Sequence, residues 1–350
     1  MTSLPHIAGR VFNTPLLIAR AKLDTILGVL MPRLKGETIP FGAKPAPCDY
    51  EITKDGIAII PVYGTLVRRT VGLEAQSGLT SYASIDDDVT AALNDKAVKA
   101  ILLDIDSPGG EAGGVFDLAD KIFASRKVKP IWAVANEDAF SAAYAIAAAA
   151  EKIYLPRTGG VGSIGVIAMH LDQSQAEADA GLSYTAIYAG DHKNDLSPHE
   201  PLSDPARAQL QAEVDRVYGL FTSTVASMRG LTVEAVKATE AGLYFGDQSV
   251  EAGLADKRGT FDDALSALSK KLSSSTTGQI LISGRNLKHK EATKMNNDDP
   301  TLTTTPTTTP APEQPTPDLA AIRVEAQKEA RTEALAYVTE VNELSHHGFF

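Results

Sequence analysis

The chain has 350 residues, 43% of them hydrophobic, and a formal net charge of −11. This length allows about two domains with a sizeable core, and the negative charge argues against nucleic acid as a partner. Because Cys48 is the one cysteine of the sequence, neither an internal disulfide nor a zinc cluster of cysteines can form, and we expect no metal site and no cofactor.

Residues 1–47 are predicted to form an amphipathic segment and a link ahead of the main domain. Apolar residues recur at helical spacing over residues 16–31, and Arg20, Lys22 and Asp24 interrupt them. This pattern predicts one amphipathic helix, too charged for a membrane span and without the features of a signal peptide. We therefore expect no membrane attachment. A link containing Pro and Gly follows over residues 32–47.

From residue 48 to residue 272, strand-like and helix-like stretches alternate. The expected strands cover residues 56–62, 100–105, 131–135, 152–155, 166–170 and 183–188. The expected helices cover residues 84–94, 115–125, 141–150, 173–181, 204–229 and 261–272. Such alternation predicts βαβ units, and therefore an α/β domain with a mainly parallel sheet and helices outside it. The long helix at 204–229 could pack within the fold or against a second subunit.

Ser141 stands at a junction between a strand and a helix. The strand at 131–135 feeds a tight turn, and the alanine-rich run AFSAAYAIAAAA follows with the serine at its start. A serine at a helix N-terminus lies near free backbone N–H groups, which can stabilise an oxyanion. The competing interpretation is an N-cap, because serine is a preferred capping residue.

A second junction lies upstream, where the strand at 100–105 ends in DSPGGEAGG. Gly109 and Gly110 permit close backbone approach, and such a pair can aim N–H groups at a developing negative charge. An ordinary turn between a strand and a helix would also favour Gly and Pro. The two junctions together, separated by one helix and one strand, are more specific than either alone.

Four motifs then follow one another in a fixed order: DSPGG, AFSAAYAIA, GSIGV and GDHKND. As an ordered set they resemble the SppA-type signal peptide peptidases, which are serine–lysine peptidases of the ClpP/crotonase superfamily. The resemblance covers roughly residues 4–268 and includes the head maturation proteases of tailed phages. The resemblance implies a ClpP/crotonase-like fold of repeated ββα units and a homo-oligomeric serine endopeptidase. Its implied substrates are phage procapsid proteins (scaffold, coat or portal), and its implied location is the host cytoplasm or the procapsid interior.

The resemblance also implies roles for individual residues. Three side chains match the family pattern: Ser141 as nucleophile, Lys193 as general base, and Ser163 as the hydroxyl that orients the lysine. The oxyanion hole matches Gly109 or Gly110 together with the N–H of Ala142. Ala142 and Ala143 stand where the family often has Gly-Gly, a change that keeps the backbone donors.

The general base is open to alternatives on the sequence alone. A lysine ammonium titrates near about 10.4 in water, so it serves as a base only where burial disfavours its charged form. Serine–lysine pairs are a recognised variant of nucleophile and base. Lys193 also reads as a solvated loop lysine among polar neighbours. Three histidines follow the nucleophile and are rival bases: His170, His192 and His199.

Other functions remain open at this stage. One is a non-catalytic scaffold or assembly protein that keeps the fold. A weaker one is acyl-CoA chemistry on a crotonase fold, for which Glu111 and Glu137 would be the nearest carboxylates. Residues 160–165 read GVGSIG, formally a dinucleotide-binding fingerprint, but a strand-like run follows where a helix would be needed.

The composition changes after residue 272. Residues 273–317 are rich in Ser, Thr and Pro and are predicted to be a disordered linker. Residues 318–350 return to helical spacing with an apolar stripe, which favours a scaffold-like tail that binds a partner helix. A single solvated helix of marginal stability is the alternative. Met295 offers an internal start for a separate scaffold product.

Overall fold

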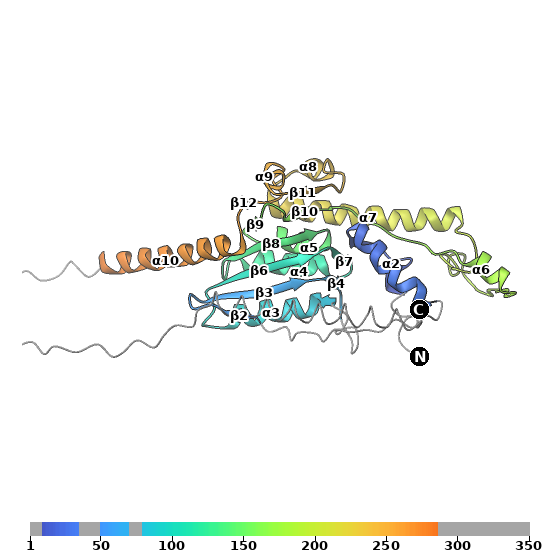
Figure 1. Cartoon of the computed structure of the whole chain (residues 1–350), viewed down its shortest axis with the longest axis horizontal. Coiled ribbons are helices and arrows are strands. Elements are labelled where there is room, and N and C mark those ends of the chain that lie inside the picture. Colours follow the sequence, from blue (N-terminus) through green and yellow to red (C-terminus); the bar gives the residue numbers. More distant parts are fainter. Residues whose placement is uncertain (1–8, 35–49, 70–78, 286–350) are drawn as a thin grey trace, which may run out of the picture. The chain divides into compact units, whose positions relative to one another are not determined.

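The computed structural model describes residues 9–34, 50–69 and 79–285, and Figure 1 shows their arrangement. Two compact units divide the chain at residue 289, and everything described here belongs to the first. The expected tail at 318–350, Met295 and the linker from residue 286 onward lie outside the described residues. The last helix, α10 (Phe261–Arg285), continues past residue 272, where the linker was expected to begin.

A large sheet of eight strands forms the centre of the fold. Its main path runs β11 (Leu243–Phe245), β10 (Gly160–Gly162), β8 (Ile131–Phe140), β6 (Ala100–Ser107), β3 (Ile57–Tyr63) and β2 (Glu51–Ile52). The pairs among β3, β6, β8 and β10 are parallel. β9 (Lys152–Leu155) joins the sheet beside the first half of β8, and β12 (Lys257–Arg258) pairs with β9. The expected α/β class with a mainly parallel sheet is confirmed.

A second, small sheet carries the strands β1 (Leu16–Ile18), β7 (Gly109–Glu111), β4 (Thr65–Val67) and β5 (Leu79–Ser81), in that order. It gives the chain a repeated ββα unit. β3 and β4 lead to α3 (Tyr82–Asn94), and β6 and β7 lead to α4 (Val115–Ser125). In each unit the first strand lies in the large sheet and the second in the small one, so the expected ββα repeat is confirmed.

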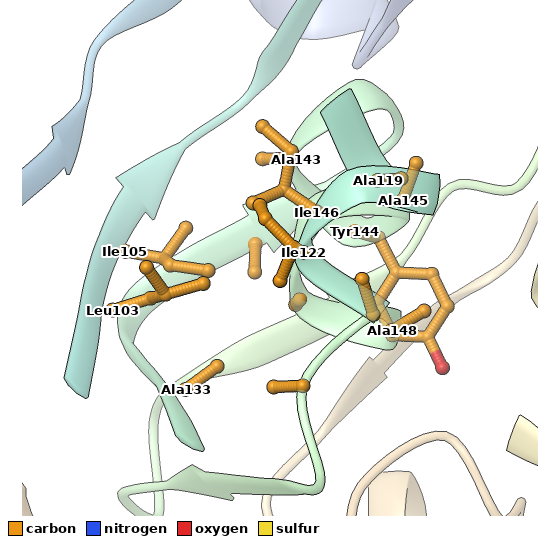
Figure 2. Packing of buried hydrophobic residues seen from close by; sticks show 14 of the residues in the cluster. Leu103, Ile105, Ala119, Ile122, Ala133, Ala143, Tyr144, Ala145, Ile146 and Ala148 are labelled. Atoms are coloured by element: carbon orange, nitrogen blue, oxygen red, sulfur yellow. The ribbon is translucent and has the colours of Figure 1, made fainter. Parts of the chain in front are cut away.

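Helices bury both faces of the large sheet. α3, α4 and α5 (Ala142–Ala148) contribute to the larger core on one face, together with α7 (Asp204–Arg229). Figure 2 shows the small side chains of α5 beside Ile122 of α4 and close to Leu103 and Ile105 of β6. Every residue of α5 is buried, and its alanines allow the helix to lie close to the strands. On the other face, α10 covers a second cluster that includes Trp132 and Leu268.

Four local predictions need correction. Residues 16–18 form a strand and not the first turn of a helix, because their backbone pairs with β7; the helix α2 (Arg20–Leu34) begins after them. Residues 136–140 continue β8, with a register irregularity against β6, where a tight turn was expected. Residues 166–170 make only isolated bridges, and residues 183–188 form no strand.

Three short helices complete the described chain: α6 (Ser174–Asp179), α8 (Val233–Lys237) and α9 (Asp247–Glu251). Among the described helices, none has both the length and the hydrophobicity that crossing a membrane requires. Within the described residues, no group of His, Cys, Asp and Glu side chains is arranged to hold a metal ion.

Candidate active site

Ser141 connects β8 to α5 in a backbone conformation that side chains rarely adopt. Its φ is 55° and its ψ is −117°, close to the first central position of a type II′ turn, where glycine is the usual residue. A non-glycine residue held there is strained, and strain of this kind concentrates at functional sites. Strand-to-helix turns that carry a serine nucleophile have this character in other folds.

The side chain of Ser141 does not cap its helix. Several other hydroxyl residues in the described chain do so, accepting a hydrogen bond from the backbone of the first turn: Ser81, Ser203, Thr232 and Thr260. Ser141 makes no such bond. Its residue is 1% exposed, and its Oγ is buried without a hydrogen-bond partner among the described residues. A buried hydroxyl left unpaired costs free energy, so the capping explanation fails at this position.

Ser163 lies next to Ser141 at the ends of two paired strands. Gly162 of β10 is the register partner of Phe140 of β8, and each serine directly follows one of them. The Ser141 N–H donates to the Gly162 carbonyl at 2.8 Å, and Ser163 also has a positive φ, of 53°. The Ser163 N–H donates to the Gly242 carbonyl at 2.9 Å. The two hydroxyl residues are therefore held at one edge of the sheet by their backbones.

The strand β7 presses against the Ser141 turn. A Cβ on Gly109 would stand 2.9 Å from the Phe140 carbonyl oxygen and 3.0 Å from the Ala142 nitrogen, so this glycine touches the start of α5. The Gly109 N–H donates to Ser107 Oγ at 3.2 Å, and Ser107 Oγ donates to the Gly64 carbonyl at 2.7 Å. Ala142 is the first residue of α5, so its N–H has no partner within the helix.

Gly110 packs against the neighbouring strand β4. A Cβ there would lie 1.8 Å from the Leu66 carbonyl oxygen, which shows that β7 and β4 approach too closely for any side chain. Of the predicted oxyanion donors, Gly109 and Ala142 thus meet beside Ser141, whereas Gly110 fixes the small sheet. Ser107 and Gly162, which support Gly109 and Ser141, were not singled out from the sequence, because only the folded backbone brings them there.

Lys193 does not meet Ser141 within this chain. It lies in a segment that we call the arm, residues 174–203, between the start of α6 and the N-cap of α7. Residues 178–193 are all exposed, Lys193 among them. Figure 1 shows α6 beyond the N-terminal end of α7. The nucleophile is buried and the proposed base is in solvent, so the structure does not bring this pair together.

The three rival histidines are bonded elsewhere. The His170 Nδ1–H donates to Asn13 Oδ1 at 3.0 Å. His192 Nδ1 lies 2.9 Å from Asp195 Oδ2. His199 Nδ1 lies 2.7 Å from Glu177 Oε1, and its ring stacks on Tyr184 with ring centroids 4.0 Å apart. None of them contacts Ser141 Oγ, since that atom has no partner among the described residues.

The carboxylates suggested for acyl-CoA chemistry are not poised at the site either. Glu111 is engaged by the Arg10 guanidinium at 2.5 Å and by the Arg68 N–H at 2.7 Å. Glu137 is exposed on β8. A more unusual carboxylate is Asp104 on β6, which accepts a hydrogen bond from the Tyr63 hydroxyl. Burial raises its pKa, the nearby Asp106 adds to the rise, and the hydrogen bonds from Tyr63 and Asn136 oppose it.

Comparison with known proteins gives this arrangement a family. A family description, "Peptidase family S49", matches residues 124–275. This stretch is a peptidase family S49 domain. It includes Ser141, Ser163 and Lys193, and it begins after Gly109 and Gly110. The expected relationship to SppA-type peptidases is thereby confirmed.

Two phage proteins are similar to the S49 domain and to the sequence before it. The "Head-tail preconnector protein GP5" of Enterobacteria phage P21 is 37% identical over 298 residues, covering 79% of this chain and 59% of that protein. The "Capsid assembly protease C" of Escherichia phage lambda is 36% identical over 291 residues, covering 77% of this chain and 66% of that protein. The chain thus spans less than two thirds of the length of either relative.

A solved structure with a related arrangement is that of a mutant of ClpP1 from Listeria monocytogenes. It is 14% identical and has a TM-score of 0.35, covering 59% of this chain and 94% of that chain. A likeness this distant adds no weight to the fold. The α/β class and the ββα repeat are instead established by the chain's own strand order.

Proposed function

We propose that this chain is a serine endopeptidase with Ser141 as its nucleophile. The observation that carries the proposal is the buried Ser141 hydroxyl, which sits on a strained turn, caps no helix and has no hydrogen-bond partner in the described chain. Gly109 and the Ala142 N–H stand beside it, where an oxyanion could be stabilised. The S49 match and the name of the lambda relative support proteolysis as the chemistry.

In this proposal Lys193 is the general base and Ser163 orients its amine. Lys193 is exposed on an arm that also exposes four large apolar side chains: Leu182, Tyr184, Ile187 and Tyr188. Apolar groups gathered on an exposed segment favour contact with another protein surface. We therefore propose that the enzyme is a homo-oligomer in which the arm of one copy carries Lys193 to Ser141 of another.

The proposed substrates are proteins of a phage procapsid: scaffold, coat or portal. The names of the two phage relatives support this class. The proposed location follows from it, namely the host cytoplasm or the interior of the assembling shell. Incubation with the coat, scaffold and portal proteins of the same genome should yield defined fragments with the wild-type chain and none with Ser141→Ala.

The nucleophile is tested directly by a fluorophosphonate probe followed by peptide mapping. We expect the probe on the peptide that contains Ser141, and no labelling of Ser141→Ala. Labelling of another serine, or equal cleavage by the Ser141→Ala variant, would reject the assignment.

The base and the oligomer are tested by mixing two inactive variants. Lys193→Met should lower kcat by roughly 10²–10⁴, the usual contribution of a general base, whereas His192→Gln should have little effect. If the dyad forms between copies, Ser141→Ala mixed with Lys193→Met should recover part of the activity. If the mixture stays as inactive as its components while wild type cleaves, the dyad forms within one chain.

A further inference from the structure

The N-terminal segment lies in the fold as an extended peptide would lie in a binding groove. β1 pairs antiparallel with β7, with Leu17 opposite Gly110 and Ile18 opposite Gly109. On its other side, Leu16 and Ile167 exchange backbone hydrogen bonds of 2.8 and 3.0 Å, and the Asn13 N–H donates to the Met169 carbonyl at 2.7 Å. Without β1, β7 would be an edge strand of the small sheet, a ready site for strand addition.

This segment places a peptide carbonyl beside Gly109, which packs against the turn that carries the candidate nucleophile. The point where a Cβ of Gly109 would stand is 2.2 Å from the Leu17 carbonyl oxygen and 3.0 Å from the Ala142 nitrogen. The Ala19 N–H also donates to the Pro108 carbonyl at 2.9 Å. Ser141 is 1% exposed with the segment in place. A substrate strand that pairs with β7 would need the space that β1 now fills.

The side chains of the segment alternate as they would in a bound strand. Leu17 is fully buried and belongs to the main core. Leu16 and Ile18 belong to a separate small cluster with Leu23 and Leu30 of α2. The segment thus buries one leucine in the main core and otherwise packs against α2 and against Ile167 and Met169. Its displacement would therefore open the small cluster and leave most of the main core intact.

Polar side-chain contacts fasten the first half of the segment. Arg10 Nε lies 2.5 Å from Glu111 Oε1, on β7. Asn13 Nδ2 donates to the Leu196 carbonyl at 2.9 Å, and Asn13 Oδ1 accepts from His170. Leu196 lies in the arm, a few positions after Lys193. The segment that lies along β7 therefore also contacts the arm that carries the proposed base.

We propose that residues 10–18 are an internal inhibitor, which fills the peptide groove between β7 and residues 167–169 and fastens the arm until the segment is displaced. The proposal rests on the proposed role of Ser141. Displacement exposes the edge of β7 to a substrate strand and frees the arm in one event. Such a device keeps the enzyme silent while its substrates assemble.

A reversible crosslink tests the inhibitor. Leu16 and Ile167 form a hydrogen-bonded antiparallel pair, whose Cα atoms are typically about 5.5 Å apart, within the range of a disulfide. In a Cys48→Ser background, Leu16→Cys with Ile167→Cys should form a lock on oxidation. We expect fluorophosphonate labelling of Ser141 to slow at least tenfold when the lock is oxidised and to recover on reduction. The two single-cysteine variants should not respond, and equal labelling in both states of the lock overturns the proposal.

A loosening variant tests the same inference in the opposite direction. Arg10→Ala with Asn13→Ala should speed labelling of Ser141 severalfold and speed hydrogen exchange at residues 109–111. Arg20→Ala is the matched control, since Arg20 pairs with Asp24 on its own helix. Faster exchange without faster labelling in an active enzyme would overturn the inhibitory role.

Peptide binding in the groove can be measured without catalysis, and this separates the inference from the proposed function. A synthetic peptide of residues 10–19 should slow exchange at residues 109–111 in the loosened variant, even with Ser141→Ala added. Protection by the peptide, in a loosened variant that keeps Ser141 but is never labelled there by the fluorophosphonate, would reject Ser141 as nucleophile and keep the groove. Absence of protection would reject the groove itself.

Discussion

The conformation and burial of Ser141 distinguish a catalytic role for this serine from a helix-capping role. Serine before a helix is normally explained by capping, and Ser81, Ser203 and Thr232 all follow that rule in this chain. Ser141 departs from it in two ways, with a positive φ and a buried hydroxyl that has no partner among the described residues. Both features cost stability, so the residue is expected to be there for its chemistry.

A prediction follows for the stability of Ser141 variants. Ser141→Gly should abolish activity yet raise the free energy of unfolding by about 1 kcal/mol, because glycine adopts the positive φ without strain, partly offset by its greater freedom in the unfolded chain. Ser141→Ala should also be inactive, but its free energy of unfolding should not rise in this way, because alanine keeps the strained positive φ. Urea denaturation of the three proteins measures the difference. A glycine variant clearly less stable than the alanine variant would show that the turn is not strained.

Asp104 gives a second prediction at the residue scale, for pH dependence. Burial raises its pKa in the folded protein above the usual value for an aspartate, so the folded state holds the proton more tightly than the unfolded state. That contribution to stability is complete below the unfolded pKa and is lost as pH rises through the folded pKa. Asp104→Asn removes this titration. Its stability relative to wild type should therefore increase as pH rises from about 4 toward 7.

The control for Asp104 is Asp120→Asn, which changes an exposed carboxylate on α4 that is not among the causes of the Asp104 shift. Denaturation of the three proteins at a series of pH values gives the comparison. A stability difference between Asp104→Asn and wild type that stays constant with pH would contradict the proposed shift.

At the scale of elements, the site depends on two sheets that meet at β7. β6 belongs to the large sheet and β7 to the small one, and the chain passes between them through Ser107, Pro108 and Gly109. Ser141 and Ser163 directly follow the strands β8 and β10 of the large sheet. The small sheet brings Gly109 against the turn at Ser141. Close backbone contact at β7 aligns the two sheets, because Gly109 and Gly110 carry no side chain that would hold the neighbouring backbone away.

A prediction for β7 uses its glycines. Gly110→Ala should destabilise the fold by about 3 kcal/mol or more, because the new Cβ would stand 1.8 Å from the Leu66 carbonyl oxygen, and the backbones of β7 and β4 must separate. Gly113→Ala is the matched control in the same loop. Its nearest contact would be 3.9 Å, at the Arg68 side chain. Thermal unfolding should show a large loss for the first and little change for the second, and equal effects would contradict the close approach.

At the scale of the whole molecule, the chain combines the S49 domain with a sequence after residue 285 of different composition. Residues 300–317 are dominated by Thr and Pro, and residues 318–350 carry helical spacing. A tether of this kind raises the local concentration of one module near the partner of the other without new contacts between them. The proposed tail would deliver the protease to the assembling shell.

The tail prediction is a truncation after Arg285, which keeps α10 whole. The shortened protein should keep its rate on small peptides but should not enter procapsids in an assembly assay. Residues 295–350 made alone should gain helix on self-association or with coat protein, measured by circular dichroism. Efficient packaging of the truncated chain into procapsids would contradict the proposal that the tail targets the protease.

The sequence alone determined the elements whose signal is local. The alternation of apolar strands and helices, the glycines of DSPGG and the alanine run after Ser141 predicted the α/β class and the junctions that follow β6 and β8. These predictions held because periodicity, turn chemistry and small side chains act over a few residues. The order of the motifs also identified the family and, through it, the ββα repeat, and the S49 match then confirmed the family.

Only the tertiary structure decided which distant segments meet. It placed residues 16–18 as a strand on β7, extended β8 through residue 140, buried Ser141 and left Lys193 in solvent. A three-residue strand has too little periodicity to be distinguished from the start of a helix, and its conformation is fixed by backbone bonds to a segment far along the chain. Burial is likewise a property of the packed chain, which is why the sequence could name the candidate nucleophile but not what covers it.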